Sequence, residues 1–197
     1  MRASSLSRHG LQVGAAAIAL LGLECARAAD ALVAVGTADV AATVPRIELK
    51  QACDRIGITL DGQPFTELRV GKDLKHGPVL FPLVGPGGVP LTRSWPVGPL
   101  LPGEPQDHPH HESFWCTHGD VNGHDFWTGR DGSRIEVASV DHVGDGRIEV
   151  SCRWLDSEGT VVCTDRRTLT FSAEDDDRII DHIITITASH GPLVLGD

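Results

Sequence analysis

The sequence predicts an all-β fold, an antiparallel β-sandwich, and three observations lead to this prediction. Apolar and polar residues alternate along several segments of the second half of the chain, which is the period of a strand with one buried face. Short clusters of Gly, Asp and Ser separate these segments, as expected of turns between strands. After residue 28 the pattern predicts no helix of useful length, and 197 residues with 41% hydrophobic content suit one domain with its own core.

Residues 1–28 are expected to be a secretory signal peptide. Arg2 and Arg8 precede an apolar run over residues 11–23, and Ala26-Arg27-Ala28 has the small-x-small pattern of a cleavage site. The run is shorter than the roughly 20 residues needed to span a bilayer, and no second run of that kind follows. These features predict a periplasmic or secreted protein with no membrane span in its mature chain.

The rest of the chain divides into a linker and one domain. Residues 29–45 are rich in Ala and Val, lack a clear period and end at Pro45, which is typical of a linker. Residues 46–197 form the expected β-sandwich domain. Its last apolar residues, 192–195, resemble the start of a further strand without a partner, so we expect the domain to be truncated at its C-terminus.

Strands are expected, in chain order, at residues 55–60, 65–70, 79–84, 91–95, 134–140, 147–155, 161–171 and 178–187. Asp61-Gly62 is a hairpin turn signal between the first two. The last four are joined by short turns, which predicts an antiparallel meander. Within this meander Ile148, Val150, Cys152 and Trp154 should share one buried face.

The acidic composition excludes one class of partner. The formal net charge is −10, and removal of residues 1–28 would take away three arginines and one glutamate and so make the chain more acidic. Nucleic-acid binding requires clustered Lys and Arg for the phosphates, and the sequence has no such cluster. The expected partner is a small molecule such as a carbohydrate.

Four cysteines remain after residue 28, and two of them flank a predicted hairpin turn. Cys152 and Cys163 lie symmetrically about residues 156–159, so a disulfide across the hairpin is one hypothesis in an oxidising compartment. Two buried thiols on a core face are the alternative.

The candidate site is the segment Asp107–Trp127, which holds five of the ten histidines. Imidazole titrates near neutrality and is the commonest metal ligand. One hypothesis is acid/base work on a sugar by catalytic histidines, with polar and aromatic residues binding the substrate. The proposed catalytic residues are His108, His110, His111 and His118, and the proposed substrate-binding residues are Asp107, Trp115, Asp120, Asn122, His124 and Trp127.

The same segment allows a metal site. His108, His110 and His118 are the proposed ligands of a divalent metal such as zinc, with His111 as a substitute for His110 and Asp107 or Asp120 as a further ligand or hydrogen-bond acceptor. The spacing matches no standard zinc motif, so the metal hypothesis stands beside a third possibility, in which His118, His124 and the tryptophans are structural.

Other polar residues are expected to be structural. His182 lies between apolar residues of a strand and should be a core histidine bonded to a neighbour. His76, His142 and His190 lie near turns and are expected to be solvated. Arg167 is expected to form a surface ion pair, and contact with an acidic substrate is the alternative.

Three motifs carry a resemblance to a known family. FPLVGPGG at 81–88, PGEPQDHPHH at 102–111 and HGDVNGHDFW at 118–127 resemble the bacterial PmoA-like family, commonly labelled "methane oxygenase PmoA". The resemblance covers roughly residues 56–197. It implies a β-sandwich similar to the galactose-mutarotase-like supersandwich, whose enzymes use a histidine and a carboxylate on a sugar's ring oxygen and anomeric hydroxyl. Glu112 departs from the basic residue often found there in the family.

The leading functional hypothesis is a periplasmic or secreted protein that acts on carbohydrate by histidine acid/base chemistry. A true methane monooxygenase subunit is excluded, because it requires several spanning helices. The alternatives are a noncatalytic carbohydrate-binding or structural module and a zinc-dependent hydrolase or lyase.

Overall fold

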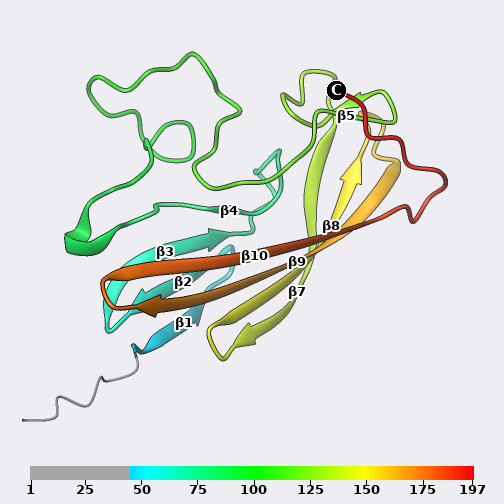
Figure 1. Ribbon diagram of the computed structural model, residues 1–197. Helices are drawn as coiled ribbons and strands as arrows, with labels where there is room; N and C mark the ends of the chain where they lie inside the picture. The colour runs from blue at the N-terminus through cyan, green and yellow to red at the C-terminus, as the bar shows by residue number, and fades with distance from the viewer. Residues whose placement is uncertain (1–44) are drawn as a thin grey trace, which may run out of the picture. The chain divides into compact units, whose positions relative to one another are not determined.

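A computed structural model describes residues 45–197, and the predicted signal peptide and nearly all of the predicted linker lie outside the described residues. Within this part the protein is an all-β, sandwich-like fold of antiparallel sheets (Figure 1). The strands, with one short 3₁₀ turn, are β1 (Ile47–Gln51), β2 (Arg55–Leu60), β3 (Gln63–Arg69), β4 (Val79–Leu80), η1 (Pro86–Gly88), β5 (Asp120–Val121), β6 (His124–Asp125), β7 (Arg134–Gly144), β8 (Arg147–Leu155), β9 (Val161–Glu174) and β10 (Asp177–Thr187).

The first sheet has the order β1-β2-β3-β4, and each pair is antiparallel. Asp61 and Gly62 both have positive φ, 49° and 73°, which the tight turn between β2 and β3 requires. The register shifts between Ile58 and Thr59, and this bulge leaves Phe65 without a Cα partner. Successive residues Phe65 and Thr66 are therefore both buried, although a regular strand would bury only one of them.

The second sheet has the order β10-β9-β8-β7 and confirms the predicted antiparallel meander. Short turns join its strands, and Asp145, Gly146 and Asp175 adopt positive φ in two of them. Ile148, Val150, Cys152 and Trp154 alternate with more exposed residues along β8 and are all buried, as the period of two predicts.

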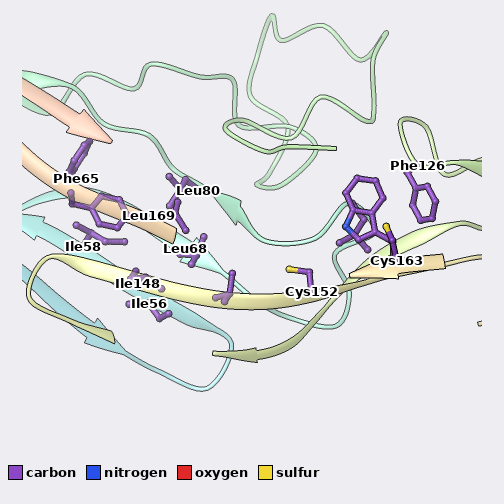
Figure 2. Packing of buried hydrophobic residues seen from close by; sticks show 14 of the residues in the cluster. Ile56, Ile58, Phe65, Leu68, Leu80, Phe126, Ile148, Cys152, Cys163 and Leu169 are labelled. Carbon is purple, nitrogen blue, oxygen red and sulfur yellow. The ribbon is translucent and has the colours of Figure 1, made fainter. Parts of the chain in front are cut away.

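One hydrophobic core joins the two sheets. It contains Ile56, Ile58, Phe65 and Leu68 of the first sheet and Ile148, Val150, Trp154, Leu169 and Phe171 of the second, some of which Figure 2 shows at close range. Phe65 and Phe171 meet edge to face, with ring centroids 6.0 Å apart. Each such buried side chain contributes about 1.5–3 kcal/mol by leaving water, so the shared core holds the sheets face to face.

The long segment between β4 and β5 is mostly irregular (Figure 1). The strand predicted at 91–95 does not form, and the backbone there is held by a side chain instead. The Glu104 carboxylate accepts hydrogen bonds from the backbone N–H groups of Ser94, Trp95 and Leu101, and these bonds lower its pKa. A partly buried, irregular loop of this kind needs such acceptors because its N–H groups have no ladder partners.

The disulfide hypothesis is wrong. A register shift beside Trp154 places Cys152 opposite Asp165 and Cys163 opposite Trp154. The four described cysteines, Cys53, Cys116, Cys152 and Cys163, are free thiols. Burial raises the pKa of Cys152 to about 12 and that of Cys163 to about 11, so the alternative of two buried thiols on a core face is confirmed.

In residues 45–197 we find no helix with the length and apolar character needed to cross a membrane.

Candidate functional site

The histidine segment divides into separate places on the surface. His110 lines one depression, while His111, Trp115 and Trp127 line a second. Asp120 and His124 line a third, beside Asp197. The predicted site residues therefore do not form one site.

Part of the segment forms a cluster of neighbouring rings, which we call the His–Trp cluster: His108, His110, His111, Trp115 and Trp127. His108 and His111 are stacked with centroids 4.7 Å apart, and His110 meets His111 edge to face at 4.5 Å. The Trp127 ring lies 5.9 Å from His110 and 5.1 Å from Trp115. Trp127 is 43% exposed, so the cluster presents an aromatic ring to solvent.

Turns on either side fix the two ends of the cluster. Before it, His108 Nδ1 is 2.8 Å from Asp107 Oδ2, and the Arg93 guanidinium donates to the carbonyls of Pro105 and His108. At its other end, the Asp125 carboxylate accepts the backbone N–H groups of Trp127 and Thr128. Capping carboxylates of this kind hold a turn in one conformation.

His118, Asp120 and Asn122 face the C-terminal segment instead of the His–Trp cluster. His118 Nε2 is 2.8 Å from the Gly196 carbonyl oxygen. Asn122 donates to the Pro192 carbonyl at 3.1 Å and accepts from the Val194 N–H at 2.7 Å. These polar groups are satisfied by backbone, so the observed contacts of His118 and Asn122 are structural.

The predicted zinc ligands do not assemble. His108 and His110 belong to the His–Trp cluster, whereas His118 bonds to the backbone at Gly196. Across residues 45–197 no three His, Cys, Asp or Glu side chains are arranged to hold a metal ion. The reason is geometric, because the chain turns between His111 and His118 and sends the two ends of the ligand set to different neighbours.

The structure adds a residue pair that sequence reasoning missed. His76, expected to be solvated, is only 4% exposed, and its Nδ1 lies 3.0 Å from Glu112 Oε1. In the described chain His76 Nε2 and Glu112 Oε2 are both buried without a hydrogen-bond partner. An unsatisfied buried polar atom costs about 1–3 kcal/mol, so two in one pair require an explanation.

Backbone bridges around β4 bring this pair together. His76 forms a parallel bridge with Ile135 of β7, and the Ile135 N–H donates to the Lys75 carbonyl at 2.8 Å. On the other side, Leu80 of β4 and Phe114 each donate a backbone N–H to the carbonyl of the other. The loop before β4 is thus held against β7 at His76, and the irregular segment around residue 112 is held against β4 at Phe114. Together the two bridges bring His76 and Glu112 into contact, although 36 positions separate them in sequence.

His76 and Glu112 line a cleft of about 470 Å³, which also includes His110. Its walls come from the start of β2, from the end of β3 and from residues of the segments 71–76, 96–97, 109–112 and 128–130, with Lys72 and His111 outside the lining. The His76 ring lies 5.2 Å from Trp115, so an unbroken series of aromatic and imidazole rings connects the buried pair with the exposed Trp127. A cleft of this size accommodates a small ligand.

His110 is the cleft histidine with a perturbed proton affinity. Burial lowers its pKa, and electrostatic repulsion from the neighbouring His111, His108, His76 and Arg130 side chains lowers it further. The neutral imidazole is therefore favoured at neutral pH. A neutral ring beside a cleft is suited to accept a proton from a bound hydroxyl group.

Two further residues differ from expectation. Arg167 is 1% exposed and forms an ion pair with Asp165 inside the sandwich, at 2.9 Å, instead of a surface pair. His182 Nε2 is buried without a hydrogen-bond partner in the described chain, whereas a bonded core histidine was expected. Both side chains lie on the inner face of the second sheet because they alternate in phase with its apolar residues.

Comparison with known proteins assigns the family alone. No curated protein and no solved structure matches the chain. A profile described as a family of unknown function, DUF6807, matches residues 55–197, which include every strand from β2 to β10. That description mentions no methane oxygenase, and the resemblance to PmoA-like proteins stays a prediction. Because the matched residues make up most of the chain, the protein belongs to the DUF6807 family of unknown function.

Proposed function

We propose that the protein is a periplasmic or secreted enzyme that acts on carbohydrate by acid/base chemistry in the cleft. The observation that supports this most is the His76–Glu112 pair at the cleft wall, buried and with one nitrogen and one oxygen unpartnered in the described chain. Buried, imperfectly satisfied titratable pairs are concentrated at functional sites. The predicted signal peptide supports the periplasmic or secreted location.

His110 is the proposed acid/base group, because it lines the cleft and is less deeply buried than His76. Its neutral form would accept the proton of a sugar hydroxyl. His76 and Glu112 are proposed positioning residues: they share a hydrogen bond at the cleft wall, and electrostatic repulsion from the His76 side chain contributes to lowering the pKa of His110. Trp127 lines the neighbouring depression, with its ring 5.9 Å from His110, and offers an exposed ring on which a sugar that extends from the cleft can stack.

The test is turnover of reducing sugars, followed by polarimetry for anomeric exchange and by product analysis for bond cleavage. We expect His110→Gln to lower kcat about 10²-fold or more, as loss of an acid/base group does. Trp127→Ala should raise KM and change kcat less. His190→Gln is the matched control, since His190 is exposed and bonds only to Ser189 among the described side chains.

A pH profile separates positioning from a merely structural role. His76→Gln removes the electrostatic repulsion of the His76 imidazole and should raise the pKa of His110, so the acid limb of the kcat/KM profile should move to higher pH. An unshifted limb would show that His76 does not act on His110. Sugar binding with no turnover in the wild-type protein would instead support a noncatalytic carbohydrate-binding module built on the exposed Trp127.

A further inference from the structure

The cleft is richer in cations than the chain around it. Four basic side chains line it, Arg55, Arg69, Lys75 and Arg130, against three acidic ones, Asp54, Asp73 and Glu112. The whole chain has a formal net charge of −10. A local excess of positive charge in an acidic protein indicates that the ligand of this cleft is negatively charged.

The ion pairs show which cations remain available. Arg55 pairs with Asp54 at 3.1 Å, and Arg69 lies 4.0 Å from Glu67 and donates to the Val97 carbonyl at 3.1 Å. Neither Lys75 nor Arg130 forms an ion pair with any residue in the described part of the chain.

These two cations flank the proposed acid/base groups. Lys75 immediately precedes His76, and its carbonyl is held by the Ile135 N–H. Arg130 comes from the loop after β6, whose conformation Asp131 holds by accepting the N–H groups of Asp125 and Ser133. Arg130 is near enough to His110 to contribute to lowering its pKa. The two cations therefore come from separate loops to one cleft.

We propose that the cleft selects an acidic sugar, a hexuronate or another carboxylate-bearing sugar, and that Lys75 and Arg130 bind its carboxylate. This inference rests on the proposed function. Guanidinium binds carboxylate through paired N–H donors, and ammonium adds a point charge. His110 is then available to accept a proton from a hydroxyl group on the uncharged part of the sugar ring.

The experiment compares binding of galacturonate and glucuronate with binding of galactose and glucose by calorimetry at neutral pH. We expect the uronates to bind about tenfold more tightly or better, a preference that weakens between about 50 mM and about 500 mM salt as the charges are screened. The Lys75→Gln/Arg130→Gln variant should lose this preference. Lys72→Gln is the control, because Lys72 belongs to the same loop as Lys75 but does not line the cleft.

The outcomes distinguish this inference from the function on which it rests. Equal binding of neutral sugars and uronates, or a preference that persists in the double variant, overturns the inference. If turnover of neutral sugars still depends on His110 in that case, the proposed function stands. If no sugar of either class binds, both are overturned.

Discussion

Arg166 and Arg167 are adjacent in β9, yet they lie on opposite faces of the second sheet. Arg166 is exposed, with 61% of its side chain accessible, and reaches the surface carboxylates of Asp141 and Glu149. Arg167 is 1% exposed and pairs with Asp165, whose carboxylate also accepts the Trp154 indole N–H at 2.7 Å. The same residue type thus has two roles, decided by the strand period.

Replacing each arginine by methionine should separate these roles. Arg167→Met leaves the Asp165 charge buried and unpaired, so we expect a loss of about 3–5 kcal/mol in the free energy of unfolding. Arg166→Met should cost less than about 1 kcal/mol, because exposed ion pairs contribute little. Urea denaturation measures both. The double variant Asp165→Asn/Arg167→Met should be more stable than Arg167→Met alone, and equal losses for the two single variants would contradict this account.

At the scale of elements, the β5–β6 hairpin anchors the segment that follows β10. Asn122 and Gly123 adopt positive φ, 54° and 82°, in its two-residue turn. The Asn122 amide then bonds to the backbone of Pro192 and Val194, and Val121 forms a bridge with Leu195. Figure 1 shows the C-terminal end beside β5. Asn122 therefore acts as a turn residue and as a clamp.

Removing the Asn122 side chain should loosen the clamp. We expect Asn122→Ala to accelerate amide hydrogen exchange at Val194 by about tenfold or more, because a hydrogen bond and a favourable turn residue are both lost. Asn122→Asp is the matched control, since it keeps the oxygen that accepts the Val194 N–H. Unchanged exchange in the alanine variant would contradict the clamp, and weaker sugar binding with unchanged exchange would restore the predicted substrate-binding role.

At the scale of the whole molecule, the stability of the sandwich should depend on pH through His182. Burial, with a smaller effect from the Arg167 charge, lowers the pKa of His182 to about 4. In the unfolded chain an imidazole titrates near pH 6.5. Its contribution to stability is therefore fully present above about pH 6.5 and is lost as the pH falls towards about 4, because only the unfolded state binds the proton in that window.

A variant that lacks His182 tests this dependence. His182 packs 5.6 Å from the Phe114 ring, so His182→Phe should keep the volume filled and remove a nitrogen that has no partner in the described chain. Other groups titrate in both proteins, and the informative quantity is the difference between their urea midpoints. We expect this difference to grow in favour of the variant between about pH 7 and about pH 4.5. A constant difference would show that His182 does not titrate on unfolding.

Much of the fold could be predicted because it depends on short-range rules. The four strands of the meander follow from a two-residue period and from turn residues that tolerate positive φ, and both signals lie within a few residues of the feature they predict. The strand expected at 91–95 does not form, because its backbone conformation depends on a contact with a side chain farther along the sequence. Its backbone is held by the Glu104 carboxylate, a side-chain contact that no period reveals.

By itself, the sequence determined the all-β class, the strand positions of the second sheet and the aromatic and histidine content of the His–Trp cluster. Only the tertiary structure decided that His76 contacts Glu112 across 36 positions, that His118 bonds to the C-terminal segment and that Arg167 is buried. The physical reason is that local periodicity places a side chain on a face of its own strand. Which residue it meets there depends on backbone bridges between distant segments, such as Leu80 with Phe114 and His76 with Ile135.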